Sequence, residues 1–162
     1  MKAQVILLKK PSDFKEEWIT KSIDEPFLDF IEGFGFYLVD KKRLDDNRPG
    51  RNAMTTSQLR NIFSEAKQIE SQIKIIQSLS KEEKEDKWKN KVKPRILLLR
   101  PKIAYATARA VDRDRDSRMK AFGEVADKAL TVATEKMEYY KNFIQMFEAI
   151  IAYHKKYGGR DK

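Results

Sequence analysis

Apolar side chains recur every three or four residues through most of the chain, which is the spacing of one face of an α-helix. The clearest run lies between residues 55 and 79 and consists of Leu59, Ile62, Phe63, Ala66, Ile69, Ile73 and Ile76. Similar runs are found at residues 22–44, 95–110, 119–132 and 134–157. The 162 residues include only six glycines and five prolines, too few for the turns of an all-β protein. The sequence therefore predicts an all-α, single-domain antiparallel bundle of about five helices.

Capping and turn residues predict where these helices begin and end. Ser22–Glu25 matches the capping box, in which the first side chain accepts a hydrogen bond from an amide one turn on. The next helix is expected to begin at Thr55–Gln58, with Thr55 or Thr56 as its cap. Ser80 is expected to begin a charged helical segment, and the Gly-Gly pair at 158–159 to end the last helix. Pro101 interrupts an otherwise continuous apolar stripe, so we expect either a kinked helix or a fresh helix beginning near that proline.

Residues 1–20 precede the first predicted helix and are expected to form a flexible N-terminal extension to a bundle domain at 21–162. The apolar run Val5–Leu8 is too short for the core of a signal peptide or for a membrane span. The chain has no cysteine, which excludes a disulfide framework and a thiolate metal site. A cytoplasmic protein without membrane contacts is therefore expected.

No set of catalytic or metal-binding residues is recognisable in the sequence. His154 is the only histidine and has no second histidine or cysteine as partner. We expect it to hydrogen-bond a backbone group at the helix end or, when protonated, to interact favourably with the helix dipole there. The alternating aspartates of residues 112–116 are spaced like calcium ligands, but Ser117 and Gly123 replace the required glycine and glutamate. That segment is instead expected to be solvated and self-paired. We expect no enzyme activity, no cofactor and no bound metal.

The net charge of +9 is concentrated in the middle of the chain. Between Lys87 and Arg109 there are eight basic residues and no acidic one, a local field that attracts a polyanion such as nucleic acid. Two sets of basic residues recur every seven positions, close to two helical turns. We define the first basic row as Arg60, Lys67, Lys74 and Lys81, and the second basic row as Arg95, Lys102 and Arg109.

The two rows differ in their acidic neighbours. Glutamates lie four residues from Lys74 and from Lys81, so the first row is expected to form ordinary ion pairs along its own helix. In the second row, Arg95 and Lys102 have no acidic residue within four positions, which favours contact with nucleic-acid phosphates over a plain solvated face. No asparagine or glutamine accompanies this row, so base-specific reading is not expected. Trp88, among three lysines, is a candidate for base stacking.

Three stretches resemble the small α-helical subunit of the type III-A CRISPR effector, the Csm complex. They are TTSQLRNIF at 55–63, RILLLRPKIAYATAR at 95–109 and FEAIIAYHKKYGGRD at 147–161. The stretches occur in the family's order, and the resemblance extends at lower quality from Phe27 to Asp161. Residues 1–20 and the segment DRDRDSR have no recognisable counterpart.

The resemblance implies a helical, non-catalytic subunit of an antiviral ribonucleoprotein, stacked in several copies as a filament. Its implied partners are the other Csm subunits, guide RNA and target RNA. A basic face would line the channel in which target RNA pairs with the guide, while cleavage of target RNA and the other activities belong to other subunits. The alternative is a helical adaptor whose basic rows bind acidic partner proteins.

The resemblance also indicates which single basic residues contact RNA, because some of them lie in the matching motifs. The resemblance implies RNA contacts at Arg60, Arg95, Arg100, Lys102 and Arg109. With neighbouring basic residues and those of the C-terminal stretch, the predicted RNA-binding residues are Arg60, Lys67, Lys93, Arg95, Arg100, Lys102, Arg109, Lys155, Lys156 and Arg160.

Overall fold

The computed structural model describes residues 8–161, so most of the Val5–Leu8 run lies outside the described residues. Residues 8–161 contain helices and loops but no strand, which confirms the all-α prediction. None of their helices is long and apolar enough to cross a membrane. The long helices are α1 (Glu25–Val39), α2 (Thr56–Ile76), α4 (Lys93–Arg113), α5 (Met119–Ala133) and α6 (Met137–Lys156). Shorter elements are two 3₁₀ helices, η1 (Pro11–Asp13) and η2 (Glu16–Thr20), helix α3 (Lys81–Lys87) and a π-helical segment at Trp88–Val92.

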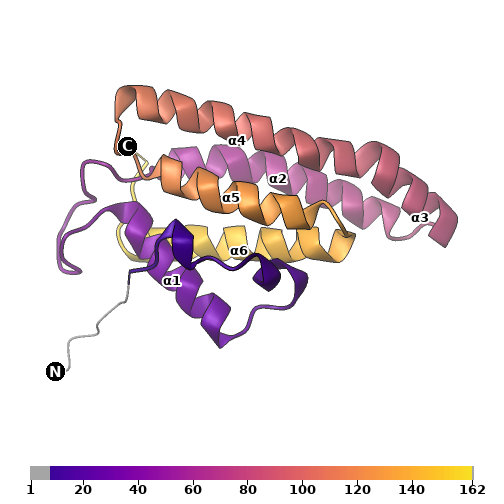
Figure 1. Ribbon diagram of the computed structural model, residues 1–162, viewed down its shortest axis with the longest axis horizontal. Helices are drawn as coiled ribbons and strands as arrows, with labels where there is room; N and C mark the ends of the chain where they lie inside the picture. The colour runs from indigo at the N-terminus through magenta and orange to yellow at the C-terminus, as the bar shows by residue number, and fades with distance from the viewer. Residues whose placement is uncertain (1–7, 162) are drawn as a thin grey trace.

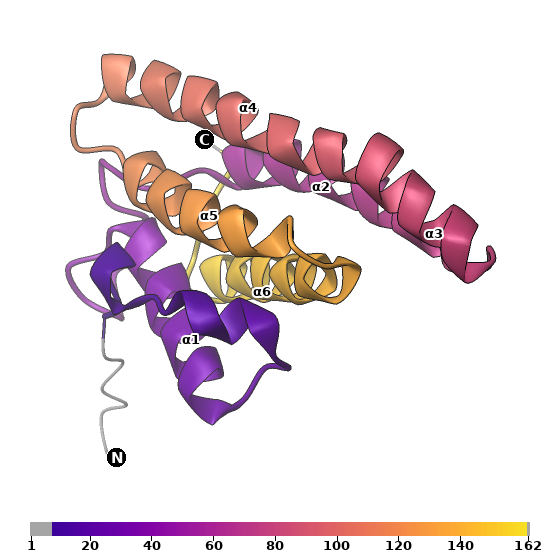
Figure 2. The same cartoon turned by 45° about the vertical axis from the view of Figure 1, so that its right-hand side comes forward.

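Helix α6 lies at the centre of the bundle and packs against α1, α2 and α5, whereas α4 packs against α5 and α2. Helices α1 and α4 lie on opposite sides of the bundle in both views (Figures 1 and 2). The side chains that α6 buries completely or nearly so include Tyr140, Phe143, Ile144, Phe147 and Ile150. Because α4 has neighbours on one side only, its other side faces solvent.

Helix α1 is shorter than predicted at both ends. Asp24, not Ser22, is its N-cap, because the Asp24 carboxylate accepts a hydrogen bond of 3.0 Å from the Phe27 amide. Pro26 fixes this start, since proline is tolerated in the first turn of a helix but not in its interior. The helix ends at Val39, and Asp40 then adopts the left-handed conformation with φ of 56°.

The predicted starts of α2 and α3 are confirmed, whereas α6 begins at Met137, three residues later than predicted. Thr55 Oγ1 accepts a hydrogen bond from the Gln58 amide at 3.1 Å, and Gln58 Oε1 accepts one from the Thr55 amide at 2.8 Å, which completes the capping box of α2. Ser80 caps α3 by accepting a hydrogen bond of 3.4 Å from the Glu83 amide.

Of the two alternatives predicted at Pro101, the fresh helix is wrong, because α4 continues through this residue. Proline has no amide hydrogen, so the Leu97 carbonyl loses its partner one turn back. Leu97 and Pro101 are both exposed, and water can satisfy that carbonyl without a break in the helix. The irregular part is instead the π-helical segment between α3 and α4.

The second half of the N-terminal extension packs against α5 and α6, and its aromatic rings contact α1. Phe14 and Trp18 are buried, and their rings contact those of Phe30 and Phe27, with centroid separations of 5.6 and 5.2 Å. The Asn142 side-chain amide of α6 donates a hydrogen bond of 2.9 Å to a carbonyl of η2. Phe14, which follows η1, and Trp18 and Ile19 of η2 therefore belong to the hydrophobic core.

His154 is fully buried at the end of α6. Its Nε2 lies 2.6 Å from the carbonyl oxygen of Met54, to which it donates a hydrogen bond. A Cβ atom at Gly159 would come within 2.1 Å of the imidazole ring, so only glycine fits there. Burial lowers the pKa of His154 below its ordinary value, although the Met54 hydrogen bond opposes this shift. The predicted structural role is confirmed, but the partner carbonyl precedes α2 rather than lying at the end of α6.

We expect His154→Ala to lower the free energy of unfolding by about 2 kcal/mol or more, because it opens a cavity and leaves the Met54 carbonyl without its donor. Thermal unfolding followed by circular dichroism measures this. Lys155→Ala, at the exposed neighbouring position, is the control and should leave the melting temperature unchanged. An unchanged melting temperature of His154→Ala together with lost RNA binding would contradict the structural role.

The lowered pKa of His154 also predicts a loss of stability in acid. The unfolded chain protonates His154 near pH 6.5, whereas the folded chain does so only at lower pH. The stability contribution is therefore present above about pH 6.5 and is lost as the pH falls below it. Urea unfolding measures the free energy of unfolding at about pH 7.5 and at about pH 5. Between these two pH values the wild type should lose more of this free energy than His154→Gln, whose side chain does not titrate. Equal losses would contradict the prediction.

Candidate nucleic-acid interface

The second basic row follows the side of α4 that faces α2. Lys102 Nζ lies 3.2 Å from Glu65 Oε2 of α2, which fixes the direction of this side. Residues seven positions apart share nearly the same side of a helix, so Arg95 and Arg109 lie before and after Lys102 along it. Neither arginine forms an ion pair with a described residue. In the second basic row, the charge of Lys102 is therefore compensated by Glu65, whereas Arg95 and Arg109 make no ion pair with a described residue.

Arg100 lies on the opposite side of α4 and faces α5. Its Nε and Nη2 donate hydrogen bonds of 2.7 and 3.3 Å to the two carboxylate oxygens of Asp127. These bonds raise the pKa of the guanidinium. Lys93 precedes Arg100 by seven residues and shares this side. The structure therefore does not bring Lys93 and Arg100 together with the second basic row.

Two of the four residues of the first basic row, Lys67 and Lys74, are engaged by one carboxylate. Glu70 Oε1 lies 2.6 Å from Lys67 Nζ and 3.5 Å from Lys74 Nζ, which confirms the predicted pair with Lys74. The hydrogen bond to Glu70 raises the pKa of Lys67. Among the described residues, Lys81 makes no ion pair with the glutamate four positions later. Arg60 is exposed at the start of α2 and is likewise without an ion pair there.

The basic residues of the C-terminal stretch lie in different surroundings. Lys156 Nζ is 3.6 Å from a carboxylate oxygen of Glu32 on α1, whereas Lys155 is exposed and makes no ion pair with a described residue. Arg160 donates a hydrogen bond of 2.9 Å to the Asn47 carbonyl. Its own carbonyl accepts one of 2.8 Å from the Thr56 amide. Arg160 is therefore held beside the first residue of α2.

Two arginines that the sequence reasoning missed lie beside Arg160. Arg48 and Arg51 line the same hollow of about 290 Å³. The start of α2, the end of α4 and the C-terminus lie at the same end of the bundle (Figures 1 and 2). Arg60 belongs to the first two turns of α2 and Arg109 to the last two turns of α4, so both are at this end. Arg48 and Arg51 belong to an irregular loop, where no helical spacing marks them.

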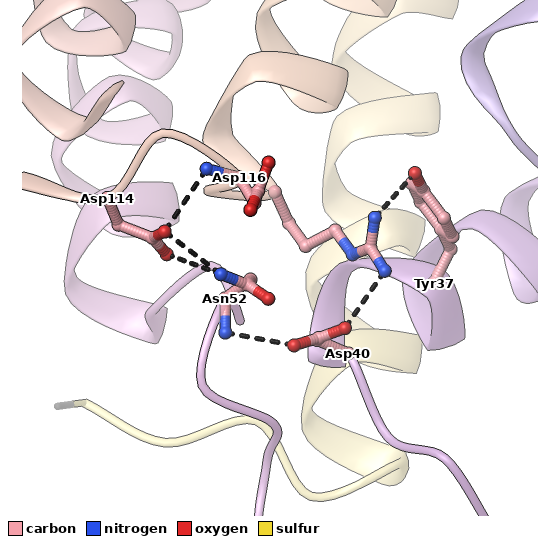
Figure 3. A network of polar contacts seen from close by, with 6 residues as sticks. Tyr37, Asp40, Asn52, Asp114 and Asp116 are labelled. Atoms are coloured by element: carbon pink, nitrogen blue, oxygen red, sulfur yellow. Dashed lines mark hydrogen bonds and ion pairs between the residues drawn. The ribbon is translucent and has the colours of Figure 1, made fainter. Parts of the chain in front are cut away.

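In the charged segment at 112–116, Asp112, Arg113, Arg115 and Asp116 are exposed as predicted, but the predicted self-pairing is wrong because Asp114 bonds Asn52 (Figure 3). The nearby Arg118 also connects distant parts of the chain. Arg118 donates hydrogen bonds to the Tyr37 hydroxyl at 2.6 Å and to Asp40 Oδ1 at 2.9 Å. The other Asp40 oxygen accepts from the Asn52 amide, and the Asn52 side chain donates to Asp114, both at 2.9 Å. No cluster of three metal-ligating side chains occurs within residues 8–161. These carboxylates bind protein donors.

This network joins the end of α1, the loop before α2 and the turn between α4 and α5 (Figure 3). The Arg118 guanidinium also lies over the Tyr37 ring, 4.0 Å from its centroid. A backbone hydrogen bond of 2.8 Å from the Arg118 amide to the Asn52 carbonyl reinforces the connection. The network thereby positions the end of α4, which carries Arg109.

These features define a small, basic, all-helical protein with one long helix exposed along its outer side. A family model described as Csm2 Type III-A matches residues 45–160. The match spans well over half of the chain, which therefore belongs to the Csm2 family and is a small subunit of the type III-A Csm complex, with other Csm subunits as partners. No curated protein and no solved structure gives a significant match. The matched range includes α2 to α6 and leaves α1 outside.

We expect Arg118→Ala to lower the free energy of unfolding by about 2 kcal/mol, because it leaves the half-buried Asp40 carboxylate without its charged partner. Arg115→Ala is the matched control, since Arg115 belongs to the same segment but is exposed and makes no ion pair with a described residue. Urea unfolding of the two variants measures the difference. Equal stabilities would show that the network does not hold these elements together.

Proposed function

We propose that this chain is a non-catalytic Csm subunit that supports the binding of guide and target RNA through the second basic row. Several copies stack as a filament within a cytoplasmic, antiviral effector complex. The observation that carries the proposal is the seven-residue spacing of Arg95, Lys102 and Arg109 along one exposed helix, with both arginines free of ion pairs to described residues.

The proposed mechanism is electrostatic. Seven residues advance an α-helix by about 10.5 Å, so the three cations form a regular line beside which an RNA backbone can lie. The Lys102–Glu65 pair is largely exposed, at 58% and 42% of the two side chains, and exposed pairs contribute little to stability. Lys102 can therefore exchange Glu65 for a phosphate at small cost. Sequence is read by pairing between guide and target, and the protein contacts the backbone.

The other predicted residues are ranked by how strongly carboxylates hold them. Arg60, near the start of α2, and Arg160, bonded to Thr56, are at the end of the bundle where α4 ends, and they extend the proposed surface there. Lys93 and Lys155 make no ion pair with a described residue and are secondary contacts. Three residues are held by carboxylates and contribute least, namely Lys67, Arg100 and Lys156.

We expect the purified chain to bind single-stranded RNA weakly, without sequence preference, and with an affinity that falls as salt increases. The triple variant Arg95→Ala/Lys102→Ala/Arg109→Ala should bind more weakly, and its salt dependence should be shallower by about 0.7 for each phosphate that it no longer binds. Fluorescence anisotropy at several salt concentrations measures both quantities.

The matched control is Lys15→Ala/Lys21→Ala/Lys136→Ala, which removes the same charge from exposed positions outside α2 and α4. This control should bind RNA as the wild type does. Equal affinity of the wild type and the triple variant of the second basic row would overturn the assignment of that row.

A second experiment distinguishes the proposed RNA-supporting function from the alternative, an adaptor for acidic partner proteins. Csm complexes are assembled with tagged chain, treated with nuclease and recovered by the tag. An adaptor keeps its partners after the RNA is removed, and the triple variant of the second basic row then loses protein partners. An RNA-supporting subunit retains its protein partners in the triple variant.

A further inference from the structure

Helix α4 is apolar on its outer side as well as on the side that faces the core. Seven positions along its outer side are exposed and uncharged, and we define them as the outer stripe: Pro94, Leu97, Leu98, Pro101, Ala104, Tyr105 and Ala108. Leu98 and Tyr105 are 57% and 67% exposed. An exposed apolar surface bordered by charged residues ordinarily marks an interaction site, so the outer stripe is suited to a ligand.

Tyr105 differs from every other aromatic residue of the chain. The 17 aromatic residues, two Trp, six Tyr and nine Phe, all lie within residues 8–161, and Tyr105 is the only one of them that is exposed. Trp88, the stacking candidate from the sequence, is half-buried and packs against the hydrophobic core. Tyr105 is therefore the one aromatic ring of the chain that is open to a flat ligand.

The surroundings of Tyr105 combine an apolar surface with positive charge. Tyr105 lines a shallow hollow of about 370 Å³ together with Leu98, Pro101 and Lys102. The Arg109 guanidinium lies 5.8 Å from the centre of the Tyr105 ring. Two residues of the second basic row thus lie beside the same hollow, and no acidic residue occurs between Lys87 and Arg109.

We propose that Tyr105 stacks against a base of single-stranded RNA while Lys102 and Arg109 bind the adjacent phosphates. This inference rests on the proposed function and adds a base contact to a surface otherwise described by charge alone. A single strand presents flat apolar bases beside a line of negative charge, which complements an apolar stripe beside a line of cations. Stacking on an aromatic ring accepts any base, so the contact is independent of sequence.

A second copy of the chain fits the outer stripe less well. An antiparallel pairing of two α4 helices through this stripe would bring both second basic rows to the same edge of the contact. Arg95 and Arg109 of one copy would then face the basic row of the other copy. Because neither arginine is paired with a carboxylate of a described residue, the two copies would repel each other. RNA removes this repulsion because it supplies the missing negative charge.

The test compares Tyr105→Leu, which keeps an apolar side chain, with Tyr105→Phe, which keeps the aromatic ring. The probe is fluorescent oligouridine, with inorganic polyphosphate as a competitor that has phosphates but no bases. We expect Tyr105→Leu to bind RNA at least about fivefold more weakly than the wild type and Tyr105→Phe to bind as the wild type. Tyr105→Leu should retain the wild-type affinity for polyphosphate. Thermal unfolding confirms that both variants fold, as expected at an exposed position.

The outcomes separate this inference from the proposed function. If Tyr105→Leu binds RNA as the wild type does while the triple variant of the second basic row does not, the stacking inference is overturned and the proposed function stands. If the wild type binds neither RNA nor polyphosphate, both are overturned. If Tyr105→Leu changes the sedimentation coefficient with no change in RNA affinity, the stacking inference is overturned and the outer stripe is a contact between copies instead.

Discussion

The burial of α6 is the constraint on which the rest of the bundle depends. Its side chains pack in three directions, against α1, α2 and α5, and its last turn carries the buried His154. Because α6 occupies the centre, α1 and α4 are placed on opposite sides of it (Figure 2). Helix α4 then completes the core with one side only, and its opposite side remains available for a partner.

This arrangement also separates charge across the molecule. Residues 11–40, on the α1 side, contain eight acidic and two basic residues, whereas the stretch from Lys87 to Arg109, mostly in α4, contains eight basic residues and no acidic one. A polyanion is therefore attracted to the α4 side and repelled from the α1 side. The long connection before α2 is fixed by the Asp40–Asn52–Arg118 network, which keeps the arginines of this loop near the end of α4.

Much of the fold could be predicted because it depends on local sequence. The capping box at Thr55 involves residues three positions apart, and the apolar stripes need only the period of the helix. The predictions fail where a single residue or a distant partner decides the outcome. Pro26 moves the start of α1, and Pro101 is accommodated because its side of α4 faces water.

The candidate site likewise has features that depend on local sequence and features that depend on distant parts of the chain. The sequence alone determined that the chain is helical, that its positive charge lies in one region and that Arg95, Lys102 and Arg109 share a side of one helix, because these properties follow from composition and helical period. Only the tertiary structure decided that Glu65 pairs with Lys102, that Asp127 holds Arg100 and that Tyr105 stays exposed. The physical reason is that Glu65 and Asp127 come from other helices, and that exposure depends on which side of α4 the core leaves uncovered.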